Sequence, residues 1–428
     1  MKRNYVSRAA LILLFSTLAK ALSFFVRIYI ARFLPLHAMK SYTLLLPTIV
    51  MFITLVQCSI PLAISKLIAE KGKSYIRLSL AFSSFLTVFC CLLLFLFSPI
   101  LSSLNHFTSS ERFLYYSILP LLPFVSLTGN LKGYFYGIQK PVIPTIAQIM
   151  EEVGRILFLY IFRLFHPTLS PSVLCFIAIF SMSIAELCSF IFMLPFFLKT
   201  KPFTTNCNIK KADFYALCHL CFPMTGSKLL GSLVYFLEPI IMLYGLSNLQ
   251  KQTLLFTYSH LHGYVLPILT MPSFLTIALS NDLLPSFTAN YHQQNYAKAM
   301  KIMIFSLGLC FLIGSSIGIL CYMLPDFIFK LCYHSTEGVQ LLKKLALPFI
   351  LYSLQAPLSA LMHGLSLSNY ALVDTCVGSL LRLWLIVTYA SKFPADCLPI
   401  ALTLGMLVTT ILHAYHVSKR ILKFQDYR

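Results

Sequence analysis

Residues 20–34 read KALSFFVRIYIARFL, an apolar stretch that carries basic side chains inside a predicted membrane span. Lys20 and Arg27 lie seven residues apart, which puts both on one face of a helix, two turns from each other. A charge in the hydrocarbon core is expensive, and such residues are rarely retained without a function. A basic helix face within the membrane therefore predicts an anionic substrate.

The composition is that of a protein that crosses a membrane many times. Of the 428 residues 58% are hydrophobic and 11% are charged, and the mean hydropathy is +0.81. The net charge of +20 would suit nucleic acid binding, but the cations lie mainly between apolar spans, as in cytoplasmic loops. The connections between spans are too short to contain a soluble catalytic domain. We therefore predict that the chain is not an enzyme.

About twelve apolar spans of bilayer-crossing length follow one another along the chain. The predicted spans are 7–34, 41–68, 78–104, 113–138, 142–165, 170–198, 217–246, 258–287, 297–324, 341–365, 370–389 and 398–417. The polar stretch 201–211 is a predicted cytoplasmic linker between an N-terminal six-helix lobe, 1–200, and a C-terminal six-helix lobe, 212–428. We therefore predict an all-α integral membrane protein.

Basic residues in the connections predict the orientation. One set of connections, which includes Lys132 and Lys140, carries about twice as many Lys and Arg as the opposite set, so both chain termini are predicted to be cytoplasmic. The basic N-terminus followed by an apolar run imitates a signal peptide. Lys20 and Arg27 interrupt that run, however, and the first span is predicted to remain uncleaved.

A weak internal repeat supports two related lobes. The second span contains Tyr42 and ends with an Ile-Pro pair at 60–61, and the eighth contains Tyr264 and ends with a Leu-Pro pair at 284–285. Two copies of one bundle, related about the membrane normal, would meet at a central cavity. Prolines inside the spans permit bends that line such cavities, although plain kinking explains them equally well.

Three segments carry a resemblance to a known family: KALSFFVRIYIARFL at 20–34, YTLLLP at 42–47 with IPLAISKLIAEK at 60–71, and LPSFTA at 284–289. They resemble the stage V sporulation protein B group of the multidrug/oligosaccharidyl-lipid/polysaccharide (MOP) exporter superfamily, which includes lipid II flippases. The resemblance implies twelve helices in two pseudo-symmetric lobes around a V-shaped cavity that opens to one side at a time. The chain departs from the group at Ser59, which is usually glycine, and at Leu266, where lipid II flippases often have a basic residue.

Four cations are predicted to bind the diphosphate head group of a lipid-linked sugar: Lys20, Arg27, Lys66 and Lys228. A diphosphate cannot enter hydrocarbon without a replacement for its water, and Lys and Arg supply one, Arg through a planar fork of donors. Lys66 lies near the cytoplasmic end of its span, where snorkelling to the interface is an equal alternative.

Two intramembrane acids, Glu238 and Asp282, are predicted candidates for ion coupling. Glu238 precedes Pro239, where a bend exposes backbone groups, and an ion pair with Lys228 is its alternative. Asp282 lies near a cytoplasmic helix end, where a capping role is the alternative. A proton, a sodium ion or the membrane potential would each suit as the driving force, and no other cofactor is predicted.

Two short motifs have structural explanations. Cys218 and Cys221 have CxxC spacing, but the sequence has no second ligand pair at zinc spacing, so no metal site is predicted. Gly314 and Gly318 form a small-xxx-small pair, which predicts close helix packing.

Together these features predict a flippase that moves an undecaprenyl-diphosphate-linked glycan precursor, lipid II or a related polysaccharide unit, across the bacterial cytoplasmic membrane by alternating access. The predicted partners are the lipid-linked oligosaccharide, membrane lipids and enzymes of cell-wall or sporulation synthesis, and not nucleic acid. The alternatives are a cation-coupled multidrug exporter, which would favour an acidic cavity, a membrane glycosyltransferase, which would need catalytic acids, and a scaffold of cell-wall synthesis.

Overall fold

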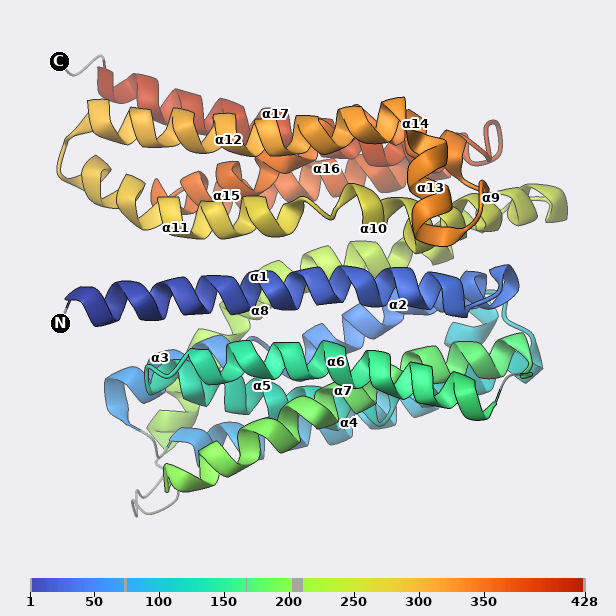
Figure 1. The fold of residues 1–428 in the computed structure, drawn as a ribbon, viewed down its shortest axis with the longest axis horizontal. Helices are drawn as coiled ribbons and strands as arrows, with labels where there is room; N and C mark the ends of the chain where they lie inside the picture. The colour runs from blue at the N-terminus through green and yellow to red at the C-terminus, as the bar shows by residue number, and fades with distance from the viewer. Residues whose placement is uncertain (1, 73–74, 167, 202–210, 426–428) are drawn as a thin grey trace. The chain divides into compact units, whose positions relative to one another are not determined.

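A computed structural model describes residues 2–72, 75–166, 168–201 and 211–425, and within these ranges the chain forms helices and turns but no strand (Figure 1). Eight helices of this part are long and apolar enough to cross a membrane, and the number is up to eleven if each of three bent pairs forms one span. The predicted all-α membrane architecture is confirmed.

The fifth predicted span, 142–165, is the one that these eleven leave out, and it forms α6 (Val142–Phe165), a continuous helix of 24 residues. α6 is not counted among the apolar spans because three charged residues, Glu151, Glu152 and Arg155, occupy its middle. The helix is therefore polar in the region where the other spans are most apolar, and its charges must find partners within the protein.

The contacts divide the chain into two compact units, Met1–Ile240 and Ile241–Arg428. The first unit contains α1 (Lys2–Phe33), α2 (Leu36–Gln57), α3 (Ile60–Lys71), α4 (Tyr75–Leu104), η1 (Ser109–Ile118), α5 (Leu121–Gly137), α6, α7 (Pro171–Lys199) and most of α8 (Lys211–Met242). The second contains α9 (Asn248–His260), η2 (Leu261–Val265), α10 (Leu266–Leu269), α11 (Ser273–His292), α12 (Tyr296–Met323), α13 (Pro325–Tyr333), α14 (Val339–Ala346), η3 (Pro348–Leu354), α15 (Gln355–Gly364), α16 (Ser368–Tyr389) and α17 (Cys397–Gln425).

The division differs from the predicted linker at 201–211, most of which lies outside the described residues. α8 was predicted to open the C-terminal lobe, but its first half packs against the first unit. Leu217 and Cys221 are buried in a cluster with α3 and α4, and the Thr225 hydroxyl donates to Cys58 Sγ at 3.5 Å. The contacts thus group most of α8 with the first unit, and the linker at 201–211 stays a prediction.

In the first unit, the second predicted span breaks between α2 and α3. Cys58 and Ser59 both adopt left-handed backbone conformations, with φ of 41° and 50°. That conformation favours glycine, so a serine at position 59 holds a strained backbone. α5 then packs closely on α3, since a Cβ added at Gly133 would lie 2.5 Å from the carbonyl oxygen of Pro61.

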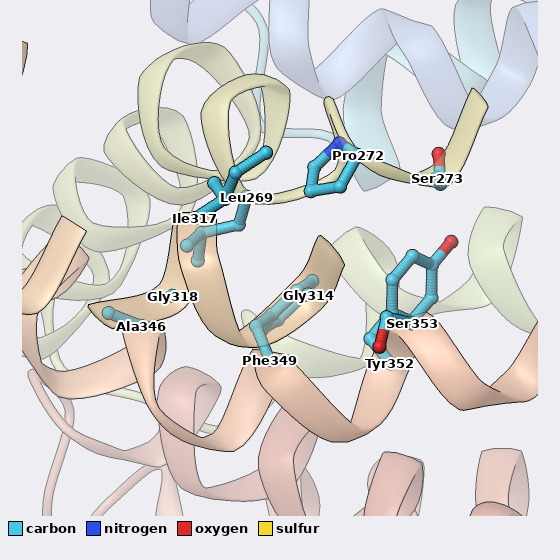
Figure 2. Close-up of a pocket in the computed structure, with 10 residues that line it drawn as sticks. All are labelled: Leu269, Pro272, Ser273, Gly314, Ile317, Gly318, Ala346, Phe349, Tyr352 and Ser353. Carbon is cyan, nitrogen blue, oxygen red and sulfur yellow. The ribbon is translucent and has the colours of Figure 1, made fainter. Parts of the chain in front are cut away.

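In the second unit, two bent spans meet the small residues of α12. α10 and α11 differ in direction by 51° at a break that contains Pro272, and α14 bends by 56° into the segment that Pro348 opens. Figure 2 shows a small pocket between these two breaks, with Gly314 and Gly318 in its wall. A Cβ at Gly318 would lie 2.9 Å from the carbonyl oxygen of Ala346, so the predicted close packing at this glycine pair is confirmed.

Candidate functional site

The candidate site is built on α1, whose buried stripe faces α6. Ala19, Val26 and Ile30 are buried and recur at helical spacing, which fixes the side of α1 that packs inward. Lys20 and Arg27 each follow a member of that stripe by one residue, or about 100° around the helix. Both side chains are exposed, so they lie at the rim of the packed face and not beneath it.

Arg27 has an acidic neighbour on α6. The carboxylate of Glu152 forms a hydrogen bond with the Ser23 side chain, and it interacts electrostatically with both Arg27 and Arg155. Ser23 lies one turn before Arg27, so α1 presents a hydroxyl and a guanidinium to the same carboxylate.

Behind this rim, charged side chains are paired between α5, α6 and α7. Lys132 of α5 forms an ion pair with Glu151 of α6, and the two side chains are 19% and 17% exposed. Thr128, one turn before Lys132, donates its hydroxyl hydrogen to Glu186 of α7, whose charge also acts on Lys132. The sequence had placed Lys132 among the cytoplasmic loop cations, and that assignment is wrong because Lys132 lies within α5.

Arg155 completes the inner pairing. Its Nε donates to Ser181 Oγ of α7 at 3.1 Å, and its Nη2 lies 3.5 Å from the Tyr42 hydroxyl of α2. Tyr42 is itself buried, so the guanidinium is held between three helices. This geometry fixes Arg155 in place, whereas Arg27 and Lys20 on α1 remain exposed.

The charges of this inner cluster nearly cancel. The cluster comprises Lys132, Arg155, Glu151, Glu152 and Glu186. When all five are ionised, two positive charges face three negative ones, and Arg27 at the rim supplies the third positive charge. Buried charges persist only when they are paired and hydrogen-bonded, and these are. The cluster therefore holds the helices together, and α1 carries the positive charge that is left over, at Lys20.

The other predicted site residues are placed as follows. Lys66 is exposed on α3 and pairs with Glu70, four residues further along the same helix, at 3.9 Å. Lys228 is exposed on α8, and Glu238 is 1% exposed on the same helix. The side chain of Asp282 lies outside the described residues. The contacts therefore associate Arg27 with α6 and Lys66 with its own helix, and the binding and coupling roles of all six remain predictions.

The cysteine motif behaves as a packing element. Cys221 is buried in the cluster that joins α8 to α3 and α4, and both Cys218 and Cys221 are free thiols. Among the residues that the structure describes, no group of three or more His, Cys, Asp or Glu side chains could hold a metal ion.

Comparison with known proteins places the chain in a family. Residues 6–291, two thirds of the chain, match the family described as polysaccharide biosynthesis protein. The chain belongs to the polysaccharide biosynthesis protein family. Its relatives in this comparison include stage V sporulation protein B of Bacillus subtilis (strain 168), 28% identical over 449 aligned positions that cover 100% of this chain and 86% of the relative. Sporulation protein YkvU of the same organism is 23% identical and covers 98% of this chain and 96% of the relative.

Solved structures show that this family member has a transporter fold. A multidrug resistance MATE family transporter of the MOP superfamily, in its inward-facing conformation, matches with a TM-score of 0.72 at 13% identity, over 95% of this chain and 96% of that one. The lipid II flippase MurJ, in an inward closed conformation, matches with a TM-score of 0.69 at 13% identity, over 97% of this chain and 89% of that one. The predicted resemblance to the MOP superfamily is confirmed, and the chain is a multi-pass membrane protein.

Proposed function

We propose that the chain is a flippase that moves an undecaprenyl-diphosphate-linked glycan precursor, with lipid II as the first candidate, across the cytoplasmic membrane by alternating access. The observation that carries the proposal is the exposure of Lys20 and Arg27 on one face of α1, beside an inner cluster whose charge Arg27 balances and Lys20 does not. The family's description and the fold shared with the flippase MurJ support the same conclusion.

The balance of charge selects the residues that meet the substrate. Lys132 and Arg155 are bound to side chains of the protein, so a phosphate would have to displace a carboxylate or a hydroxyl to reach them. Lys20 is exposed, and Arg27 shares Glu152 with Arg155. A diphosphate that approaches α1 therefore meets the unmatched cation Lys20, with Arg27 about 10 Å away along the helix by the rise per residue, and displaces no partner of Lys132 or Arg155.

The test measures translocation of a fluorescent lipid II in vesicles that contain the purified chain. We expect Lys20→Gln and Arg27→Gln each to reduce the initial rate several-fold, and the double substitution to reduce it further. Lys20→Arg should keep most of the rate because it keeps the charge. Arg32→Gln is the matched control, since Arg32 is exposed on the same helix and lies near its end. Unchanged translocation in the double variant would reject the proposal.

A multidrug exporter is the alternative within the same fold, and the same vesicles distinguish it. The proposal expects no uptake of a cationic dye above that of empty vesicles. Dye transport by wild-type protein that does not move lipid II would support the exporter instead. Product formation from lipid-linked sugars by the purified chain would support a glycosyltransferase.

We also propose that both termini face the cytoplasm, which rests on the asymmetry of loop cations. A tag at either terminus should be cleaved by an added protease only after the cells are opened. Cleavage of either tag on intact spheroplasts would contradict this orientation.

A further inference from the structure

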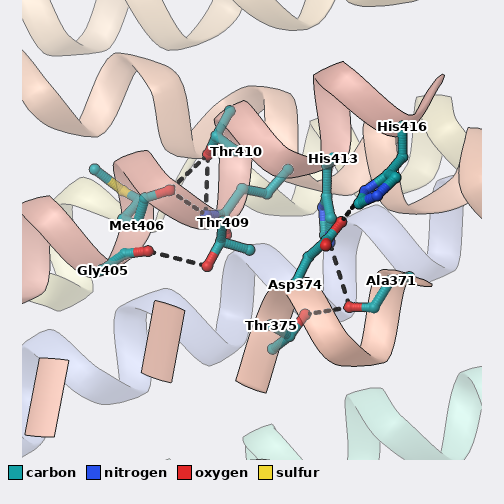
Figure 3. A network of polar contacts seen from close by, with 10 residues as sticks. Ala371, Asp374, Thr375, Gly405, Met406, Thr409, Thr410, His413 and His416 are labelled. Atoms are coloured by element: carbon teal, nitrogen blue, oxygen red, sulfur yellow. Dashed lines mark hydrogen bonds and ion pairs between the residues drawn. The ribbon is translucent and has the colours of Figure 1, made fainter. Parts of the chain in front are cut away.

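The second unit buries an acid between two histidines. Asp374 of α16 is 2% exposed, and Figure 3 shows His413 and His416 of α17 directed toward its carboxylate. His416 Nδ1 lies 3.0 Å from Asp374 Oδ2, and His413 Nε2 lies 3.9 Å from the same oxygen. The two histidines are three residues apart, so one helix face supplies both rings.

Close helix packing fixes this geometry. A Cβ added at Gly378 would lie 2.6 Å from the carbonyl oxygen of Gly405, so α16 and α17 approach each other almost backbone to backbone. Asp374 lies one turn from Gly378, which brings its short side chain within reach of α17. His413 Nε2 also lies 3.4 Å from the carbonyl oxygen of Ala371, one turn before Asp374.

We propose that Asp374, His413 and His416 form a single proton-binding site that couples proton movement to transport, an inference that rests on the proposed transport function. With both imidazoles neutral, the site carries one negative charge; one added proton makes it neutral, and a second makes it positive. Groups this close titrate as a unit, and histidine is the side chain that changes charge near neutral pH.

The ligand chemistry selects a proton over a metal cation. Sodium and other hard cations take oxygen ligands, whereas two of the three groups here offer imidazole nitrogen. His416 is 21% exposed and His413 is 4% exposed, so in this proposal a proton enters the site through His416. His413 Nδ1 is buried without a hydrogen-bond partner among the described residues, and it is the inner position that a proton entering through His416 would reach last.

Few other charges act on this site. His363 of α15 interacts electrostatically with His413, and its own Nδ1 lies 2.9 Å from Ser368 Oγ. Lys419 lies over the ring of Tyr415, and Arg420 interacts with Tyr291 of α11. The basic residues of α14 lie toward the other end of α17, where Lys344 pairs with Asp396.

The site is connected to a bent span of the same unit. Thr410, one turn before His413, accepts a hydrogen bond at 3.2 Å from Gln355 Nε2 at the start of α15. Gln355 directly follows η3, the segment that begins at the 56° break after α14. A change of charge on α17 therefore acts next to a place where the backbone already departs from a straight helix.

The test begins with proton binding, which needs no substrate. In the purified full-length chain labelled with ¹³C and ¹⁵N at histidine, signals of His413 and His416 are assigned by their loss in His413→Gln and His416→Gln. In the wild type we expect both histidine signals to follow the same titration curve as the pH is changed. In either variant the signal of the remaining histidine should have a titration midpoint different from that in the wild type. Asp374→Asn should move both midpoints, and His363→Gln, the matched control, should leave the joint titration in place. Independent titration in wild type would overturn the proposal.

The second part measures coupling. An imposed pH gradient should raise the initial rate of lipid II translocation several-fold in wild type and His363→Gln vesicles, and should have no effect in His416→Gln vesicles. If Asp374→Asn does not fold, His416→Gln decides the result alone. Stimulation by a sodium gradient and not by a pH gradient would overturn the coupling. Joint titration without any lipid II movement in wild type would reject the proposed substrate and leave the proton site standing.

Discussion

The two units bury polar groups in different ways. The first unit matches fixed charges in pairs, as in Lys132 with Glu151. The second surrounds one carboxylate, Asp374, with the imidazole rings of two histidines. The difference teaches that one fold buries charge in two ways: fixed pairs join the helices of the first unit, whereas the site around Asp374 is the one that we propose binds a proton in the second.

The largest expected effect comes from breaking a matched pair in the first unit. Lys132→Met removes the cation and leaves Glu151 and Glu186 buried, which should lower the free energy of unfolding by about 3–5 kcal/mol. The double substitution Lys132→Met with Glu151→Gln should recover a substantial part of that loss. Thermal unfolding of the detergent-purified chain measures both. If the losses of the two single variants simply add in the double variant, the pair is not coupled.

The next effect separates packing from charge. Gly378→Ala places a methyl group against the backbone of α17 and should lower the free energy of unfolding by about 1–3 kcal/mol, with loss of the joint histidine titration. Gly133→Ala, equally tight against α3, should lower stability by a similar amount and leave the titration intact. Gly231→Ala is the control in open space on α8 and should be neutral or stabilising. A normal titration in Gly378→Ala would show that close packing does not position Asp374.

A smaller effect tests the break between α2 and α3. Ser59 holds a left-handed conformation, and its buried hydroxyl has no hydrogen-bond partner among the described residues. Ser59→Gly should therefore raise the free energy of unfolding by about 1 kcal/mol. Ser65→Gly, in the interior of α3, should change stability in the opposite direction. Loss of stability in Ser59→Gly would mean that the serine side chain contributes more than the strained backbone costs.

The smallest effect contrasts an exposed ion pair with the buried ones. Lys66 and Glu70 are more than half exposed, and their charged atoms lie 3.9 Å apart. Lys66→Gln should change the free energy of unfolding by less than about 0.5 kcal/mol, since water and salt screen such pairs. The measurement uses the same unfolding assay at low and high salt. A loss as large as that of Lys132→Met would remove the distinction between the two kinds of pair.

The sequence was sufficient for the architecture because span length and apolar composition are local properties. It predicted α6 as a span despite its charges, bends at some of the prolines inside the spans, and the tight packing at Gly314 and Gly318. It did not predict which charges meet. Lys132 was assigned to a loop because its partners, Glu151 and Glu186, are 19 and 54 residues away in the chain.

The same limit applies to the second unit. Nothing in the sequence placed Asp374 beside histidines about forty residues further on; only the crossing of α16 and α17 does so. The i, i+3 spacing of His413 and His416 was the one signal available. A boundary set by burial, such as the one after α8, is likewise a property of contacts, which polarity along the chain does not reveal.

During synthesis, α6 would enter the lipid poorly if it were inserted as an isolated segment. Each charged residue at the centre of a helix opposes insertion by about 2.5–3.5 kcal/mol, and three of them stand in its middle. Lys132 on the preceding α5 pairs with Glu151, Ser181 on the following α7 accepts from Arg155, and Glu152 is bound by Ser23 of α1, which is already synthesised. These neighbours must therefore stay together at the translocon, so that α5, α6 and α7 enter the bilayer as one cooperative package and not one at a time.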